Sequence, residues 1–167
     1  EEKFKKTIII PSWPKIGPAD KRDLGVKYAK GEIIAFIDDD AYPNNRWLST
    51  ALNEFSKEVV AICGPGLNPP SDHLFAQVSG WMWSSFMGAG GVGTYRNWPG
   101  KRRFVDDYPT FNLLVDKKIF EKIGGFDSRF WPGEDTKLCH DLVYKLNKKI
   151  IYSPEVYVYH HKRKILK

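Results

Sequence analysis

The sequence feature that most constrains the fold is an apolar run that ends in three consecutive carboxylates. Residues 33–37 are Ile, Ile, Ala, Phe and Ile, and Asp38, Asp39 and Asp40 follow them directly. An apolar run without alternation is typical of a strand covered on both faces, as in parallel sheets with helices on either side. Ligands bind outside the carboxyl ends of the strands in such sheets. We therefore expect an α/β fold with a ligand site at the acid triplet.

The acid triplet also indicates a bound cation. Adjacent carboxylates repel one another, and a divalent cation that prefers oxygen ligands would neutralise them. The alternative is a solvated turn that caps the next helix, because Asp is common in turns and before helices. An acid triplet directly after so apolar a strand is uncommon under the usual burial preferences, which favours the cation.

Length and composition predict a single domain, residues 1–167, with a real core. No apolar run reaches the length of a membrane-spanning helix. Cys63 and Cys139 stand in apolar segments without metal or disulfide spacing, so a reducing, cytoplasmic compartment is expected. The net charge of +6 suits an anionic partner, which is nucleic acid, a phosphorylated ligand or an acidic membrane face. This charge gathers at residues 101–103 and in a basic tail, residues 161–167.

Apolar periodicity and turn residues predict the order of the elements. Strands are expected at residues 7–10, 33–37, 59–63, 111–115, 150–152 and 156–159, and helices at 20–30, 44–55, 71–87, 116–123 and 135–146. Lys21 and Arg22 fall in the first turn of the first helix, where cations oppose the helix dipole unless an anion lies nearby. They are therefore candidate phosphate ligands, although exposed charge explains either one singly.

The middle of the chain is rich in aromatic residues and glycine. The helix predicted at 71–87 contains Trp81 and Trp83, which are either core residues or a platform for a ring-shaped ligand. Residues 88–93 match the spacing G-x-G-x-x-G of dinucleotide-binding turns, but they lack the preceding strand and the following helix. We expect a mobile glycine-rich loop beside a site, or else a plain connector.

Two further candidates lie late in the chain. Glu134 and Asp135 open a helix, and Asp135 starts the stripe that continues at Leu138 and Cys139, so its carboxylate should point toward the protein body. A first-turn acid that stabilises the dipole explains Glu134 well and Asp135 less well. His160 leaves the last predicted strand and is a metal candidate if it lies near the acid triplet.

Three segments in this order, AKGEIIAFIDDDAYPNNRWL, GGFDSRFWPGEDTKLC and VYVYHHKR, resemble the inverting nucleotide-sugar glycosyltransferases of family 2. The resemblance extends from about Gly17 to Arg163 and implies a GT-A fold, a Rossmann-like mixed α/β sheet flanked by helices. Members of that family normally begin with a strand, a helix and a further strand that bind the nucleobase. Residues 8–11 stand too close to Lys21 to be the first of these strands. The chain is thus expected to be a partial GT-A domain without the first βα units.

The resemblance also implies roles for individual residues. Asp38 and Asp40 would form the D-x-D element, with Asp40 binding Mn²⁺ or Mg²⁺ that bridges the diphosphate, and Asp38 and Asp39 would lie near the ribose and sugar. His160 would complete the metal shell together with Asp40 and Asp38, or contact a phosphate. The catalytic pair would be Glu134 and Asp135, with Asp135 as the base.

Donor and acceptor contacts complete the set of site residues. Lys21 and Arg22 align with the segment before the family's usual Arg-Asn pair, where this chain has Asp23 in place of Asn, which departs from the family pattern. The candidate stacking surfaces for an acceptor sugar are Trp131, Trp81 and Trp83, with a core role as the alternative.

The predicted function is metal-dependent, inverting transfer of a sugar from a nucleoside-diphosphate sugar to a hydroxyl of a glycan or lipid-linked glycan. The cation takes up the charge of the leaving diphosphate, and a base on the opposite face of the sugar deprotonates the acceptor. The basic tail would contact the inner face of the membrane.

Two alternatives remain from the residues alone. A haloacid-dehalogenase-like phosphatase would use Asp38 as nucleophile and Asp40 as acid, but it expects Thr or Val where Tyr42 stands. A non-catalytic basic nucleic-acid-binding module suits the net charge but leaves the acid triplet unexplained, so no nucleic-acid partner is expected.

Overall fold

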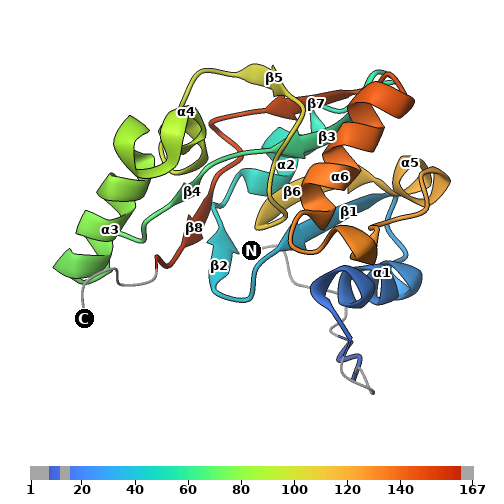
Figure 1. Ribbon diagram of the computed structural model, residues 1–167, viewed down its shortest axis with the longest axis horizontal. Coiled ribbons are helices and arrows are strands. Elements are labelled where there is room, and N and C mark those ends of the chain that lie inside the picture. Colours follow the sequence, from blue (N-terminus) through green and yellow to red (C-terminus); the bar gives the residue numbers. More distant parts are fainter. Residues whose placement is uncertain (1–7, 12–15, 163–167) are drawn as a thin grey trace.

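The computed structural model describes residues 8–11 and 16–162, and a five-stranded mixed sheet forms its centre (Figure 1). The strands lie in the order β1 (Ile33–Ile37), β6 (Asn112–Asp116), β3 (Val59–Cys63), β7 (Lys149–Tyr152) and β5 (Arg103–Val105). β3 and β7 run parallel, whereas β1–β6, β3–β6 and β5–β7 are antiparallel pairs. The predicted mixed α/β sheet is therefore confirmed.

Helices cover both faces of this sheet, and each face has its own core. On one face, α1 (Pro18–Tyr28), α5 (Lys117–Lys122) and α6 (Glu134–His140), which continues into a π-helical turn at Asp141–Lys145, pack over one set of strand residues. On the other face, α2 (Trp47–Leu52) packs over the alternate residues of the same strands. Leu113 belongs to the first core and Leu114 to the second, as the two-residue period of a strand requires.

A small second sheet, in the order β2 (Ala41–Pro43), β8 (Val158–His160) and β4 (Gly66–Leu67), extends from the first. Asn112 ties the two together, because its buried amide donates to the carbonyl oxygens of Gly64 and Val156 at 2.7 Å each and accepts from Trp47 Nε1 at 2.8 Å. A Cβ on Gly64 would lie 2.0 Å from the Val156 oxygen, so this bend needs glycine.

Two helices, α3 (Leu74–Ser84) and α4 (Phe86–Arg96), stand together at one side of the molecule (Figure 1). The mobile loop predicted at residues 88–93 is wrong, since these residues lie in α4, which bends at Ala89 and Gly90. The glycines serve helix packing: a Cβ on Gly88 would lie 1.9 Å from the Met82 oxygen, and one on Gly93 would lie 2.4 Å from the Trp83 oxygen. Only glycine allows α4 to approach the end of α3 this closely.

β1 differs from its prediction in one respect. Instead of a strand covered on both faces in a parallel sheet, it pairs antiparallel with β6 at the edge of the sheet, and its burial alternates. Ile34 and Phe36 are buried, whereas Ala35 and Ile37 are exposed. An apolar run alone does not tell a central strand from an edge strand.

The prediction of a strand at residues 7–10 is also wrong for the three residues that the structure describes. Ile8–Ile10 have no regular structure, and Thr7 lies outside the described residues, as do residues 163–167 of the basic tail. The strands at 41–43, 66–67 and 103–105 were not predicted because they are too short to show a period. Within the described ranges, none of the helices is both long and apolar enough to cross a bilayer.

Candidate active site

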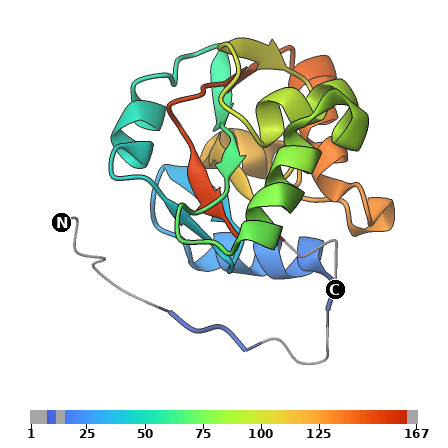
Figure 2. The same ribbon diagram turned by 90° about the vertical axis from the view of Figure 1, so that its left-hand side faces the viewer.

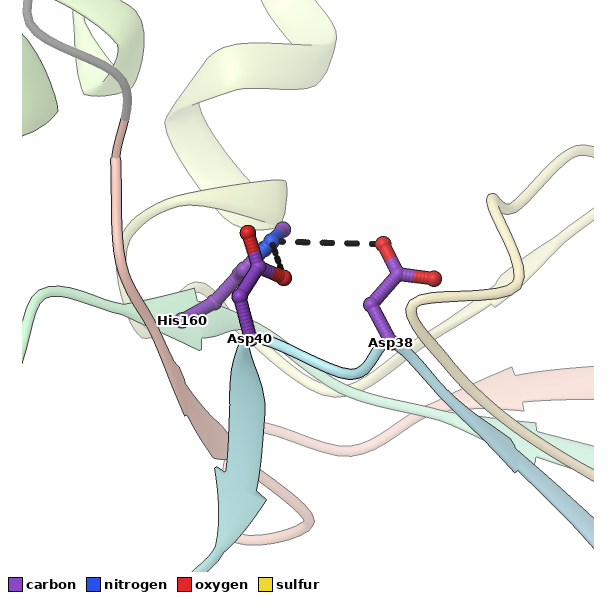
Figure 3. A group of neighbouring side chains, drawn as sticks. All are labelled: Asp38, Asp40 and His160. Carbon is purple, nitrogen blue, oxygen red and sulfur yellow. Dashed lines mark ion pairs between the residues drawn. The ribbon is translucent and has the colours of Figure 1, made fainter. Parts of the chain in front are cut away.

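The acid triplet lies in the turn between β1 and β2. Asp38 follows β1 directly, and the Ala41 N–H donates to the Asp38 carbonyl oxygen at 3.1 Å, which closes a tight turn. β2 then pairs with β8 in a register that places Ala41 opposite His160. The register therefore carries His160 to the acid turn: its Nε2 lies 3.0 Å from Asp40 Oδ1 and 3.9 Å from Asp38 Oδ2 (Figure 3).

These three side chains form a candidate metal centre. One ligand atom from each, two carboxylate oxygens and an imidazole nitrogen, lie within 4.8 Å of one another. Carboxylate oxygens suit Mg²⁺ and Mn²⁺, and an added imidazole is well suited to Mn²⁺. The donor set thus fits the expected cation. Asp39, the middle acid of the triplet, is exposed in the same turn.

The imidazole of His160 is held mainly by aromatic packing. It stacks on Phe111 with 5.2 Å between ring centroids, while its Nδ1 is buried and has no hydrogen-bond partner within the described structure. Burial and the nearby Lys162 lower the pKa of His160, against the opposing effect of Asp40 and Asp38. The neutral imidazole, which has a free lone pair for a metal, is therefore favoured.

Lys162 is a further candidate site residue, which the sequence alone does not single out. Its ammonium lies 5.7 Å from the Phe111 ring centroid, and burial lowers its pKa to about 8 although Asp40 and Asp38 act in the opposite direction. The signal was its position two residues after His160, because alternate residues of an extended segment share a side. A half-buried cation next to the acid turn can contact an anionic ligand.

The second acidic element is the start of α6, where Glu134 turns inward. It is 6% exposed and accepts hydrogen bonds from Arg22 Nη1 at 2.8 Å and from the Gly133 N–H at 3.1 Å. Burial alone would raise the pKa of Glu134, but the backbone hydrogen bonds and Arg22 together hold it below its usual value. The structure thus pairs two predicted site residues, Arg22 and Glu134, with each other.

Arg22 also connects the two acidic elements. It lines a groove of about 330 Å³ that runs over β1 as far as Ile37, the residue before Asp38. The same guanidinium holds Glu134, so the start of α6 is fixed relative to the end of β1. Asp135 is half-buried, and its Oδ1 accepts from the Thr136 N–H at 2.9 Å.

The comparison with known families decides what kind of protein has this site. Residues 2–124 match the model of glycosyl transferase family 2. The chain belongs to this family. The pre-mycofactocin glycosyltransferase of Mycobacterium tuberculosis is 26% identical over 150 residues, which is 88% of this chain and 30% of that protein. The probable N-acetylgalactosaminyltransferase 9 of Caenorhabditis elegans is 28% identical over 129 residues, 68% of this chain and 22% of that protein.

A solved structure shows the same fold. The mannosyltransferase PcManGT from Pyrobaculum calidifontis, in complex with GDP-Man and Mn²⁺, aligns with a TM-score of 0.58 over 92% of this chain and 38% of its own, at 16% identity. The family 2 domain therefore has the predicted GT-A fold. It spans between 22% and 38% of the length of these three proteins.

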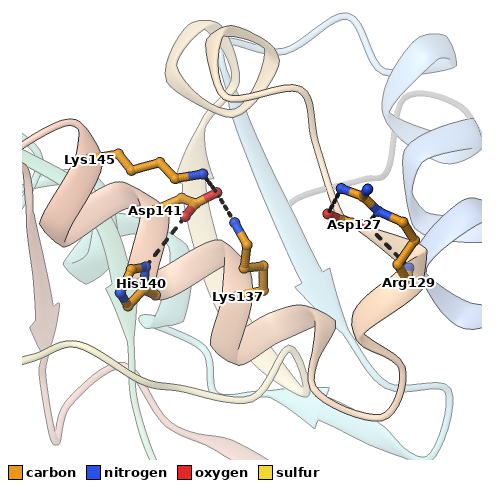
Figure 4. A network of polar contacts seen from close by, with 6 residues as sticks. All are labelled: Asp127, Arg129, Lys137, His140, Asp141 and Lys145. Atoms are coloured by element: carbon orange, nitrogen blue, oxygen red, sulfur yellow. Dashed lines mark hydrogen bonds and ion pairs between the residues drawn. The ribbon is translucent and has the colours of Figure 1, made fainter.

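In this family 2 domain an ionic network joins α6 to the π-helical turn that continues it (Figure 4). Asp141 is buried and pairs with Lys137, with Lys145 at 2.9 Å and with His140 Nδ1 at 3.4 Å. Burial would raise the pKa of Asp141, but these hydrogen bonds lower it. At the other end, Thr136 Oγ1 donates to Asp107 at 2.8 Å, and Arg96 of α4 pairs with the same carboxylate at 2.6 Å.

The remaining predicted residues do not gather in one place. Trp131, which is 63% exposed, directly precedes the loop into α6, whereas Trp81 and Trp83 are exposed on α3. α3 and α6 lie on opposite sides of the family 2 domain (Figure 1), so the three tryptophans do not form one platform, and none of them is a core residue. Lys21 is exposed in the first turn of α1.

A wider groove than the one that Arg22 lines lies away from the acid turn. It has a volume of about 840 Å³ and includes Tyr42, Tyr157 and Tyr159 in its lining. Tyr159 precedes His160 in β8, and neighbouring residues of a strand face opposite sides. This groove therefore lies across the small sheet from the candidate metal centre.

Proposed function

We propose that the chain carries the donor half of a metal-dependent, inverting glycosyltransferase that moves a sugar from a nucleoside-diphosphate sugar to an acceptor hydroxyl. The observation that carries this proposal is the convergence of Asp38, Asp40 and His160 within 4.8 Å at the end of β1. Membership of family 2 supports sugar transfer, and a structural relative binds GDP-Man with Mn²⁺. A phosphatase or a nucleic-acid-binding module gains no support from these relatives.

The donor would be held by the acid turn. Asp40, Asp38 and His160 would bind Mn²⁺ or Mg²⁺, which supplies Lewis-acid neutralisation of the leaving diphosphate. Lys162 offers a second positive charge beside the same acids. Asp39 and Asp38 are proposed to contact the ribose and sugar, and Lys21 is a candidate for a phosphate.

The acceptor would be activated from α6. We assign the base to Asp135: its carboxylate accepts the proton of the acceptor hydroxyl as that oxygen attacks the anomeric carbon, and the bond to the diphosphate breaks on the opposite face. Glu134 is engaged by Arg22 and Gly133, so its proposed part is to hold Asp135 in place. Trp131, exposed beside α6, would stack on an acceptor sugar.

The acceptor class and the compartment are also proposals. We favour a glycan or lipid-linked glycan acceptor at the cytoplasmic face of a membrane. Cys63 and Cys139 are both buried and free, which fits a reducing compartment.

Calorimetry tests the metal centre directly. Titration with Mn²⁺, alone and then with GDP or UDP, should show binding that Asp40→Asn weakens by about tenfold or more, because one of two charged ligands is lost. The matched control is Asp39→Asn, the same charge change in the same turn, which should leave the affinity for Mn²⁺ alone within about twofold. Equal losses in the two variants, or no loss with Asp40→Asn, would remove the metal assignment.

A further inference from the structure

α3 presents its apolar stripe to solvent. Residues 74, 75, 78, 81 and 82 fall on one side of a helix with 3.6 residues per turn. Their exposed fractions are 68% for Leu74, 58% for Phe75, 40% for Val78, 57% for Trp81 and 45% for Met82. An ordinary surface helix turns such a stripe toward the core. In the described structure nothing covers it.

The opposite side of α3 explains why the helix packs this way. That side has three small, buried residues, Ala76, Ser79 and Gly80, followed at its end by Trp83, which is 42% exposed. A Cβ on Gly80 would lie 1.8 Å from the side-chain oxygen of Asn68, so the helix rests on the segment after β4 through its smallest residues. The large side chains of the stripe are therefore left partly or mostly at the surface.

The exposed apolar surface continues into α4, which follows after Ser85. Phe86 is 71% exposed and Met87 is 94% exposed. We call these two residues, together with the five of the α3 stripe, the α3–α4 apolar surface; Figure 2 turns this side of the molecule toward the viewer. Contiguous apolar patches of this kind mark interaction sites.

The segment that carries this surface has formal charges of one sign in its sequence. From His73 to Val105 the sequence contains no Asp or Glu, while it contains Arg96 and the run Lys101, Arg102 and Arg103. Arg96 pairs with Asp107 and Arg102 pairs with Glu54, so both are partly neutralised. Lys101 and Arg103 are exposed, and Arg103 lies over the Tyr95 ring of α4 at 4.7 Å.

We propose that the α3–α4 apolar surface docks on an anionic phospholipid bilayer, with Lys101 and Arg103 next to the lipid headgroups. Helices that lie in a membrane interface have Trp, Phe and Leu on one face and cations beside it. The apolar face enters the boundary of the acyl chains, and the cations contact anionic headgroups. α3 has 11 residues, which is too short to span a bilayer but sufficient to lie on one. The surface lacks the acidic residues that such a membrane would repel.

This proposal does not rest on the proposed transfer reaction, but it has a consequence for it. Asp72, two residues before α3, pairs with His161 Nδ1 at 2.7 Å, and His161 follows the metal candidate His160. Docking would therefore hold the acid turn close to the membrane, where a lipid-linked acceptor would present its sugar.

Vesicle co-sedimentation tests the docking surface. The chain is mixed with vesicles of phosphatidylcholine alone or of phosphatidylcholine with phosphatidylglycerol, and the bound fraction is measured against lipid concentration. Partitioning to the anionic vesicles should be stronger and should fall with added salt. The double variant Leu74→Ser/Trp81→Ser should lower the partition coefficient by about tenfold or more, whereas Leu52→Ser, at a 47% exposed leucine of α2, should leave it unchanged.

Two double charge-reversal variants distinguish docking on anionic lipid from nonspecific adsorption. Lys101→Glu/Arg103→Glu should abolish the preference for anionic vesicles, and Lys118→Glu/Lys122→Glu, the same change on exposed residues of α5, should keep it. Circular dichroism checks that each variant stays folded. Absence of binding to both vesicles, equal losses with the control variants, or a dimer in sedimentation equilibrium that Leu74→Ser dissociates would overturn the proposal.

Discussion

Replacement of one carboxylate at the start of α6 should destabilise the fold, whereas replacement of its neighbour should not. In Glu134→Gln the change removes the charge that Arg22 Nη1 contacts at 2.8 Å and the Gly133 N–H contacts at 3.1 Å. Hydrogen bonds to a charged group contribute about 1.5–3 kcal/mol each. The Arg22 side chain is 26% exposed and regains some hydration when it is released, so we expect a loss of about 1–2 kcal/mol in the free energy of unfolding.

The matched variant is Asp135→Asn. Its carboxylate accepts one hydrogen bond, from the adjacent Thr136 N–H, at a half-buried position. Its effect on the free energy of unfolding should stay within about 0.5 kcal/mol. Urea unfolding at neutral pH, followed by tryptophan fluorescence, measures both variants. In thermal unfolding, Glu134→Gln should lower the Tm by about 2–8 °C for a chain of this length.

Two further measurements check the cause. In a double-mutant cycle with Arg22→Gln, most of the loss in Glu134→Gln should appear as coupling energy. Since the contacts hold the pKa of Glu134 below its usual value of 4.5, its stabilising effect is present above pH 4.5 and is lost as the pH falls through the lowered pKa. The parent and Glu134→Gln should therefore converge in strongly acidic solution. Equal destabilisation by Asp135→Asn, or a coupling energy near zero, would refute the assigned ion pair.

Three other predictions follow from the packing and the charges. Asn112→Ala removes the hydrogen bonds of Trp47 Nε1 and the Val156 oxygen, while the Gly64 oxygen keeps the Tyr108 hydroxyl; it should lower the free energy of unfolding in urea by about 2–4 kcal/mol, and a loss under about 1 kcal/mol would contradict the role of Asn112 as the tie between the sheets. Gly64→Ala, whose Cβ would lie 2.0 Å from a backbone oxygen, should lower the free energy of unfolding by about 2–3 kcal/mol. The control Gly25→Ala, which has open space around it in α1, should leave the free energy of unfolding unchanged or raise it in the same measurement. Hydrogen bonds from Lys137 and its neighbours lower the pKa of Asp141 against the effect of burial, so the stability that Asp141 contributes is complete above pH 3.8 and is lost below it. As the solution is acidified, the urea midpoint of the parent should therefore fall more steeply than that of Asp141→Asn. Parallel curves of urea midpoint against pH would disprove this.

Local sequence was sufficient for the elements that position the donor half of the site. The strand at residues 59–63 lies where it was predicted, and so does the strand at 33–37 that delivers the acid turn. The helix predicted at residues 116–123 forms as Lys117–Lys122, and the side chain of Asp116 caps it by accepting from the Ile119 N–H at 2.9 Å. Periodicity and capping involve residues within a few positions of one another, so the sequence displays them directly.

Side-chain direction at the start of α6 was predicted less well. The helical stripe favoured Asp135 as the residue pointing inward, whereas the structure buries Glu134 and leaves Asp135 half-exposed. Arg22 of α1 accounts for this difference, because its guanidinium lies 2.8 Å from the Glu134 carboxylate. A partner so distant in the sequence cannot be inferred from a helical period.

The sequence by itself determined the family, the acid turn after an apolar strand, and the types of residue that hold a divalent cation. The tertiary structure decided which of these residues meet. The pairing register of β2 with β8 brings His160 and Lys162 close to Asp40. The glycine-rich segment 88–93 forms part of α4, where its glycines allow α4 to pack closely on the end of α3. The tertiary structure also turns the apolar stripe of α3 outward, because the small side of that helix fits the protein. Periodicity reveals that a helix has two unlike sides, but only the neighbouring surface determines which side is buried.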